Sequence, residues 1–171
     1  MHTPAPLPLS SMSVERFVEA LDGLYERSPW VAERAHRLGG FADADALRAA
    51  LRDAVDSADI DAQRALLCAH PELGARSAAL AHLTSESRSE QAGAGLTSSG
   101  EALLAEIAGL NAAYRARHGF PFIVAVRGLS VTEIIAAMRA RIDRATEVEH
   151  AEALAQVHRI AGFRFADRFG A

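Results

Sequence analysis

The stretch "RHGFPFIVAVRG", Arg117 to Gly128, decides the fold class. Its centre, Pro121 to Val126, is an apolar run of β-branched and aromatic residues, the composition of a β-strand. A strand needs a partner for its backbone groups, and the rest of the chain offers no second run of this kind. We therefore predict an all-α fold, a single-domain helical bundle that encloses one buried extended segment.

Helical periodicity and helix-start residues fill the rest of the chain. Ser130 and Thr146 are each followed three residues later by glutamate, which predicts a capping box at both positions. The helix expected to start near Ser98 runs to about Arg117. The expected starts are, in order, Ser13, Ser28, Asp43 or Asp45, Asp59 or Asp61, the range 84–87, Ser98, Ser130 and Thr146.

Length, composition and charge describe an ordinary soluble protein. The chain has 171 residues, of which 50% are hydrophobic and 23% charged, and a formal net charge of −4. The positive charges are all arginine and are spread along the chain, so we expect neither nucleic-acid nor membrane binding. No secretion signal or membrane-spanning run is visible, which predicts a cytoplasmic protein. Residues 1–12 read as a flexible, proline-rich leader and residues 13–171 as the folded domain.

A histidine stands directly before a proline in "LLCAHPELGARS", Leu66 to Ser77. Proline disfavours the α-conformation in the residue before it, so the preceding helix should end at about His70. An imidazole on a fixed helix end suits a catalytic group, and it equally suits a ring that only caps the helix. Cys68, the single cysteine, lies in the same apolar helix and is expected to be a buried, inert thiol.

Three further features could serve a ligand or the fold. In "TSESRSEQAGAGL", Thr84 to Leu96, a helix would place Ser87, Glu90 and Gln91 on one face, either toward a polar planar ligand or toward solvent. The backbone groups of the extended segment need partners, from a ligand or from neighbouring helix ends and side chains. His118 is either a ligand contact or a helix C-terminal residue that favours the helix dipole.

The last helix carries an arginine at the edge of its inward face. Leu154, Val157, Ala161 and Phe165 form a buried stripe. Arg164 follows Val157 by seven residues and so points only about 20° away from it. A buried arginine needs an anion, which is either a protein carboxylate or a substrate anion. His150 and His158 on this helix are expected at the surface.

Signatures of several other enzyme classes are missing from the sequence. There is no glycine-rich phosphate loop, no His-Glu-x-x-His zinc motif and no Gly-x-Ser-x-Gly elbow. The seven histidines show no metal-ligand spacing, and one cysteine builds no zinc cluster. We expect no metal and no organic cofactor.

Four motifs in this order resemble the OHCU decarboxylase family of purine catabolism, in which OHCU is 2-oxo-4-hydroxy-4-carboxy-5-ureidoimidazoline. The motifs are "AHPELG", "SxxEQAGAGL", "NxxYxxRHGFPFIVAVRG" and "RIAGFRFAD". The resemblance covers about Ser13 to Phe169. It implies an all-α, cofactor-independent and often dimeric carboxy-lyase, which converts OHCU to (S)-allantoin during urate degradation. His118 and Glu72 depart from the aromatic residue and the aspartate that many relatives have at these positions.

The resemblance also implies a set of site residues. His70 would be the general acid or base, Glu90 would bind ring or ureido N–H groups and orient His70, and Arg164 would hold an anionic oxygen. Ser87 and Gln91 would fix the ureido arm. The implied substrate contacts are Pro71, Ser87, Arg88, Ser89, Glu90, Gln91, Phe122, Ile123, Val124, Ala125 and Val126.

Two other functions compete with this one. An amidohydrolase acting on a ureido compound would need an activated water, for which the sequence offers no metal site. A non-catalytic helical module would bind a ureide or a protein partner without turnover. We expect no fused hydroxyisourate hydrolase activity, because one helical domain already uses the 171 residues.

Overall fold

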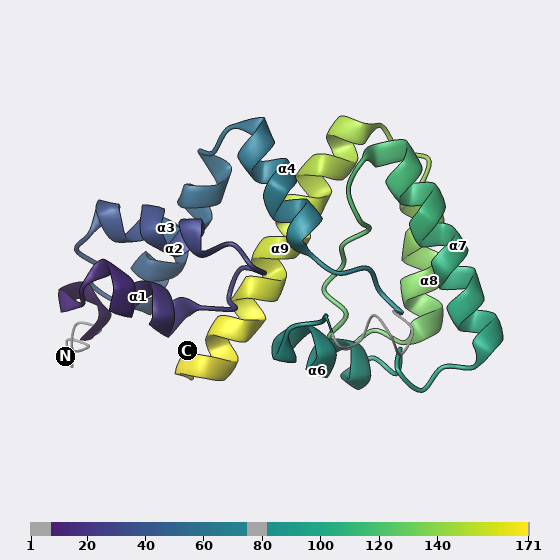
Figure 1. Cartoon of the computed structure of the whole chain (residues 1–171), viewed down its shortest axis with the longest axis horizontal. Helices are drawn as coiled ribbons and strands as arrows, with labels where there is room; N and C mark the ends of the chain where they lie inside the picture. The colour runs from purple at the N-terminus through teal and green to yellow at the C-terminus, as the bar shows by residue number, and fades with distance from the viewer. Residues whose placement is uncertain (1–7, 75–81, 171) are drawn as a thin grey trace. The chain divides into compact units, whose positions relative to one another are not determined.

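The computed structural model describes residues 8–74 and 82–170, and in that part of the chain it contains helices and no strand, which confirms the all-α prediction (Figure 1). The extended run 121–126 carries no regular secondary structure. The helices are η1 (Pro8–Ser11), α1 (Val14–Leu21), α2 (Pro29–Leu38), α3 (Ala44–Asp56), α4 (Ile60–Ala69), α6 (Ser85–Gly93), α7 (Glu101–His118), α8 (Val131–Arg141) and α9 (Thr146–Phe169).

The chain forms two compact units. One, here the terminal unit, comprises Met1–Leu66 with Ala161–Ala171, and the other, here the central unit, comprises Leu67–Ile160. Both boundaries fall inside helices, α4 and α9, instead of in loops. A boundary inside a continuous helix leaves no linker composition, which is why the sequence showed one domain without a division.

Most of the predicted helix starts carry their capping bonds. Four of them, at Ser13, Asp43, Asp59 and Thr84, accept a hydrogen bond from the backbone N–H three residues later. Ser130 and Glu133 form the full capping box of α8. The start of α7 differs from the prediction by three residues, because Gly100 and not a serine precedes it.

The second predicted capping box is wrong. Helix α9 begins at Thr146, and its first turn closes from Glu149 N to the carbonyl of Ala145, so Ala145 takes the capping position. The Thr146 hydroxyl instead lies 3.0 Å from Nδ1 of His118. The Glu149 carboxylate is also used elsewhere, in a buried ion pair.

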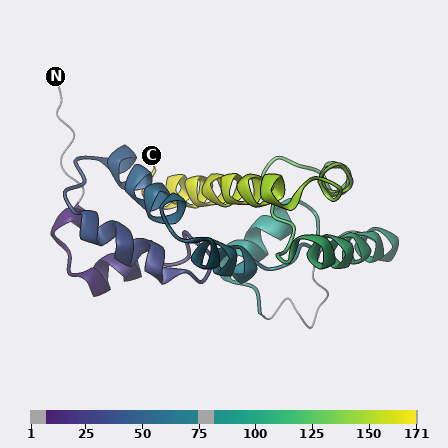
Figure 2. The same cartoon turned by 90° about the horizontal axis from the view of Figure 1, so that it is seen from above.

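In the terminal unit, α1, α2 and α3 pack around an apolar core, as the two views show (Figures 1 and 2). Phe17 and Leu47 are fully buried in it, and the Phe17 ring stacks against Phe41. Part of the predicted leader joins this core, because Pro8–Ser11 forms a 3₁₀ turn and Leu9 is buried. Residues 1–7 lie outside the described chain.

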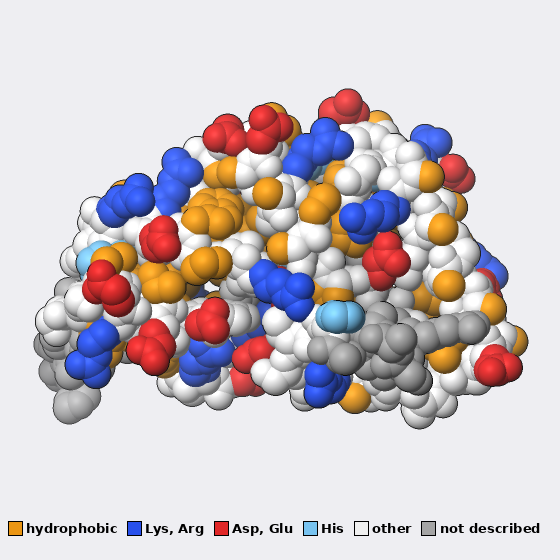
Figure 3. Space-filling view, viewed as in Figure 1, with side chains coloured by type: hydrophobic (Ala, Val, Ile, Leu, Met, Phe, Trp, Pro, Cys, Tyr) orange, Lys and Arg blue, Asp and Glu red, His pale blue; other side chains and the backbone are white. Residues whose placement is uncertain are grey.

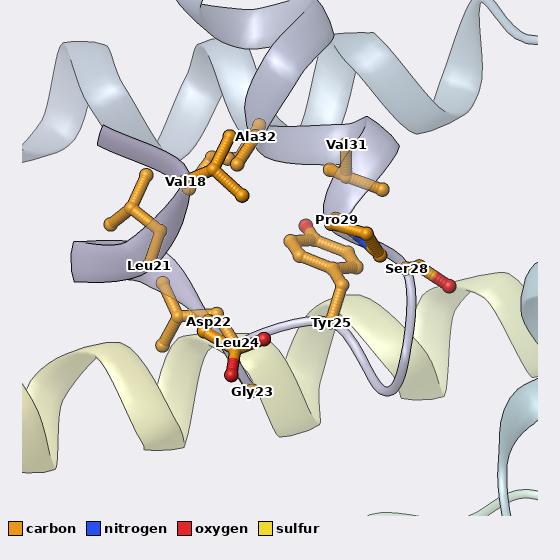
Figure 4. Close-up of a pocket in the computed structure, with 11 residues that line it drawn as sticks. Val18, Leu21, Asp22, Gly23, Leu24, Tyr25, Ser28, Pro29, Val31 and Ala32 are labelled. Carbon is orange, nitrogen blue, oxygen red and sulfur yellow. The ribbon is translucent and has the colours of Figure 1, made fainter. Parts of the chain in front are cut away.

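The loop between α1 and α2 encloses a small cavity in this unit (Figure 4). The Tyr25 ring rises from the loop between the side chains of Val18 and Leu21 on one side and Val31 on the other. Tyr25 is 7% exposed, and burial raises the pKa of its hydroxyl. The cavity volume is about 10 Å³, room for roughly one water molecule, so it is a packing feature and not a substrate pocket.

The surface shows how the charges are distributed, and it overturns the expectation for one residue. Acidic and basic side chains are interspersed on the face drawn in Figure 3, without a block of either sign. No helix of the described chain is long and apolar enough to cross a membrane. The expectation for Cys68 is wrong: the residue is exposed, and its Sγ lies 3.6 Å from the carbonyl of Gly119. The apolar stripe of α4 is buried through Leu66 and Leu67, which leaves their neighbour Cys68 on the outer side.

Candidate functional site

His70 stands at the end of α4, as its following proline predicted. The helix ends at Ala69, and the backbone N–H of His70 still donates to the carbonyl of Leu67, at 3.2 Å. The imidazole is 7% exposed. The side chain is therefore held at a fixed helix end and largely shielded from solvent, a setting in which contacts to a reacting group are strong.

The turn that follows His70 is tied to two other helices. From α6, the Gln91 side chain accepts from the Gly74 N–H at 3.0 Å and donates to the Glu72 carbonyl at 3.3 Å. From α7, the Asn111 amide donates to the Leu73 carbonyl at 2.9 Å. Three consecutive residues after Pro71 thus have their backbone held by two amide side chains.

Gly74 closes this turn in a conformation that suits glycine. Its φ of +69° lies in the left-handed region, and a Cβ there would stand 3.1 Å from Cγ2 of Ile107. The backbone therefore packs directly on α7. An ion pair of 3.5 Å between Glu72 and Arg115 adds a surface contact to the same helix.

The polar face predicted on α6 points inward. Ser87 and Gln91 are 4% and 3% exposed, and Glu90 between them is half-buried. Arg88 and Ser89 are exposed, because they lie on the opposite side of the helix. The alternative of a solvated face is therefore wrong for Ser87 and Gln91. The solvated face is correct for Arg88 and Ser89, which were two of the expected substrate contacts.

Of the two kinds of partner that the sequence left open for the extended segment, the structure contains protein side chains. Arg141 donates to the carbonyl of Ile123 at 2.9 Å, and Gln156 accepts from the N–H of Ala125 at 2.9 Å. Within residues 8–74 and 82–170, the backbone N–H and C=O groups of Phe122 and Val124 have no protein partner. Side chains thus bind one backbone group of Ile123 and one of Ala125, and the backbone groups of Phe122 and Val124 remain available to a ligand.

A buried charged cluster supports this segment, and the sequence analysis missed it. Both Nε and Nη2 of Arg141 lie within 3.0 Å of Glu149 Oε2, and the Tyr114 hydroxyl donates to the same oxygen at 2.5 Å. The Arg141 guanidinium also stacks on the Phe122 ring, 4.5 Å from its centroid. Burial, and then the hydrogen bond to Glu149, raise the pKa of Tyr114.

The signal for Arg141 was present in the sequence. It follows Ile134 by seven residues and Met138 by three, so it falls on the buried stripe of α8. The same spacing argument identified Arg164 on α9. Glu149 was assigned to a capping box, which hid its role.

Arg164 belongs to the terminal unit, whereas His70, α6 and the extended segment belong to the central unit. Arg164 is 5% exposed, as its place on the helix predicted, and its Nη1 donates to Glu26 Oε2 at 3.0 Å and to the carbonyl of Gly23 at 2.8 Å. Of the two anions that the sequence left open, the structure contains the protein carboxylate.

Three further histidines, His118, His150 and His158, lie in or against the protein interior. His118 is 1% exposed, and its Nε2 lies 3.0 Å from the carbonyl of Ile142. With the contact of its Nδ1 to Thr146, this bridge joins the end of α7 to the end of α8 and the start of α9, which favours the structural alternative for His118. His150 and His158 are half-buried and not at the surface as expected, and the His150 ring meets the edge of Phe120. In the described ranges, no three His, Cys, Asp or Glu side chains are grouped to hold a metal ion.

Comparison with known proteins gives one consistent result. The profile of the OHCU decarboxylase family matches residues 10–166. The chain is 40% identical to the 2-oxo-4-hydroxy-4-carboxy-5-ureidoimidazoline decarboxylase of Haloferax volcanii, over 99% of this chain and 98% of that protein. It is 35% identical to the uric acid degradation bifunctional protein PucL of Bacillus subtilis, over 93% of this chain and 31% of that longer protein.

Solved structures agree in fold. A crystal structure of (S)-allantoin synthase superposes with a TM-score of 0.71 at 31% identity, over 94% of this chain and 52% of that chain. A structure of OHCU decarboxylase in the presence of (S)-allantoin gives a TM-score of 0.68 at 23% identity, over 82% of this chain and 91% of that one. At that identity the second match supports the helical fold alone.

Proposed function

The chain belongs to the OHCU decarboxylase family, and from this premise we propose that it converts OHCU to (S)-allantoin in urate degradation, without a metal or organic cofactor. The observation that carries the proposal is the buried His70 at the end of α4, followed by a turn whose backbone is hydrogen-bonded to α6 and α7. Such a side chain is already oriented before substrate arrives.

The reaction breaks the bond between the carboxylate carbon and the ring carbon. Carbon dioxide leaves, and the electron pair forms a double bond to the neighbouring ring carbon, which carries the ureido arm, while the ring nitrogen that was doubly bonded to that carbon takes up a proton. The hydroxyl group left on the first carbon then loses its proton and becomes a carbonyl, and a proton added from one side to the ureido-bearing carbon gives the (S) product. His70 exchanges the proton, either taking it from the substrate hydroxyl or delivering it to the carbanion. An imidazole suits this step because its ordinary pKa is close to neutrality.

The remaining residues would bind and orient the substrate. Glu90 accepts hydrogen bonds from ring or ureido N–H groups and orients His70, and Ser87 binds the ureido arm. The backbone groups of Phe122 and Val124, which have no protein partner among the described residues, would pair with amide-like edges of the substrate. Pro71 and the apolar side chains of 122–126 would form the walls.

Arg164 is proposed to hold an anionic oxygen, and its bond to Glu26 gives the proposal a direct test. Arg164→Lys and Glu26→Gln both weaken that ion pair. If Arg164 also binds substrate, Arg164→Lys raises KM well beyond the effect of Glu26→Gln. Equal KM values in the two variants would assign Arg164 to the fold alone.

The decisive measurement generates OHCU in situ, from urate with urate oxidase and hydroxyisourate hydrolase, and follows the handedness of allantoin by circular dichroism. OHCU also decays without an enzyme, so both rate and handedness count. Fast appearance of (S)-allantoin that is lost in His70→Asn, with an unchanged far-UV spectrum, is the expected result. Racemic product at the spontaneous rate would overturn the enzyme assignment in favour of a ureide-binding module.

A cytoplasmic homodimer completes the proposal. Its support is the family, and the chain itself carries no membrane-spanning helix within residues 8–74 and 82–170. Light scattering after size exclusion measures the mass against 18.2 kDa for one chain, and fractionation of the source cells locates the protein.

A further inference from the structure

We propose that Gln91 and Asn111 form a clamp that positions His70 against the α6 residues Ser87 and Glu90. The inference rests on the proposed function, since it concerns the residue that exchanges the proton. It assigns Gln91 to the protein backbone in place of the ureido arm, and it adds Asn111, which the sequence analysis did not select.

The Gln91 side-chain amide binds the protein backbone with both its oxygen and its nitrogen. Its oxygen accepts from Gly74 and its nitrogen donates to Glu72, so both ends of the amide have backbone partners. Gln91 is 3% exposed, so these bonds are shielded from water. A glutamine held in this way fixes the distance between α6 and the turn after His70.

Gln91 lies on α6 beside the two residues that are proposed to bind substrate. It follows Glu90 directly and lies four residues, about one helical turn, after Ser87. The two bonds of Gln91 therefore connect the helix that carries Ser87 and Glu90 to the segment that begins one residue after His70. Movement of the turn relative to α6 would change the geometry between the histidine and the proposed substrate-binding residues.

Asn111 makes the clamp rigid from a second direction. Its Nδ2 donates to Leu73, the residue between the two that Gln91 holds, and the side chain is 4% exposed. Gly74 packs on Ile107, one turn earlier on the same helix. With one amide from α6 and one from α7, the turn is fixed against rotation as well as translation.

The test replaces each amide by leucine, which keeps the size and removes the hydrogen bonds. Gln91→Leu and Asn111→Leu are compared with Gln63→Leu as a matched control. Gln63 is a half-buried amide that also donates to backbone carbonyls, those of Val55 and Asp56, but it holds the turn between α3 and α4. Turnover is measured below the unfolding temperature of every variant. The enzyme concentration is high enough for catalysed turnover to be faster than the spontaneous decay of OHCU.

A clamp makes a specific prediction for kinetics and stereochemistry. In both clamp variants kcat falls by roughly ten- to hundred-fold while KM changes by less than about two-fold, because a misplacement near 1 Å impairs the chemical step. The excess of (S)-allantoin also falls, since a misplaced acid protonates either side of the ring. A merely structural role would lower the amount of folded enzyme and leave the handedness per turnover unchanged, as expected for Gln63→Leu.

NMR of the His70 imidazole in the same variants distinguishes an error in the clamp proposal from an error in the proposed function. Displacement of His70 predicts shifted resonances in both clamp variants and unshifted ones in Gln63→Leu. Unchanged kcat and product handedness, or unchanged His70 resonances, would overturn the clamp. A wild-type protein without turnover would overturn the proposed function alone, and the NMR result would then decide on the clamp.

Discussion

The two units of this protein each bury one arginine–glutamate pair, and in both the arginine also holds a backbone carbonyl of a non-helical segment. In the central unit Arg141 binds Glu149 and the carbonyl of Ile123. In the terminal unit Arg164 binds Glu26 and the carbonyl of Gly23. A loop without helical hydrogen bonds needs partners for its carbonyls, and a guanidinium with five N–H donors can bind a carboxylate and a carbonyl together.

The pairs differ in how they are built. Arg141 and Glu149 are eight residues apart on consecutive helices, and an aromatic ring and the Tyr114 hydroxyl complete their surroundings. Arg164 and Glu26 are 138 residues apart in the chain. The local pair supports the segment proposed to bind substrate, and the distant pair joins the last helix to the first loop. The same pair of side chains is therefore assembled within a short stretch of chain in one unit and across most of the chain in the other.

Removal of one carboxylate is expected to have the largest effect on stability. Glu149→Ala and Glu26→Ala each leave a buried guanidinium without its anion, which costs about 3–5 kcal/mol of unfolding free energy. Urea unfolding followed by circular dichroism measures both values. A loss below about 1 kcal/mol in either variant would contradict the burial of that pair.

Replacement of both charged partners together sharpens the comparison. Arg141→Met with Glu149→Leu, and Arg164→Met with Glu26→Leu, should recover most of the lost stability, because a packed apolar pair avoids the desolvation of two ions. Activity should not recover with stability in either double variant, because Arg164 is itself proposed to hold an anionic oxygen of the substrate. The first double variant loses its support for Ile123 and falls in kcat/KM, a loss that restored stability does not reverse, and urea unfolding beside the coupled allantoin assay tests this.

The Tyr114 hydroxyl makes a smaller contribution to the free energy of unfolding, and it does so only through the Arg141–Glu149 pair of the central unit. Tyr114→Phe removes a hydrogen bond to a buried carboxylate and should cost about 1.5–3 kcal/mol. In the background of Glu149→Leu with Arg141→Met the same substitution should cost less than about 1 kcal/mol, since the acceptor is gone. Equal costs in the two backgrounds would show that the hydroxyl acts independently of the pair.

The dependence of stability on alkaline pH allows a comparison of the two tyrosines of the chain, Tyr25 in the terminal unit and Tyr114 in the central unit. Burial raises the pKa of both Tyr25 and Tyr114 above the ordinary value of 10.0, so the folded protein keeps protons that the unfolded chain releases. Stability is then fully present below pH 10.0 and falls above it, by about 1.4 kcal/mol per pH unit for each proton retained. The absence of lysine keeps this range clear of other abundant groups. Tyr25→Phe and Tyr114→Phe should each reduce the slope of unfolding free energy against pH. An unchanged slope in both variants would contradict the raised pKa of the two tyrosines.

Much of this architecture follows from local sequence rules. The end of α4 at His70, the inward face of α6 and the burial of Arg164 rest on proline geometry and helical spacing, which act over a few residues. The partners do not follow in this way. Glu26 lies in a loop far from Arg164 in sequence, and the Gln91 and Asn111 bonds depend on how three separate helices pack. Glu149 had a plausible local role as a cap, and tertiary packing gave it another.

The smallest expected effect concerns the second arginine at Glu149. Arg144 lies 3.5 Å from Glu149 Oε1, but its side chain is 44% exposed, whereas that of Arg141 is 7% exposed. Solvent screens the Arg144 charge, so Arg144→Ala should cost less than about 1 kcal/mol and should matter less still at high salt. Arg141→Ala should cost several times more and show little salt dependence, as urea unfolding at low and high sodium chloride would measure. Burial, and not the number of charges near Glu149, would then decide how much each arginine contributes.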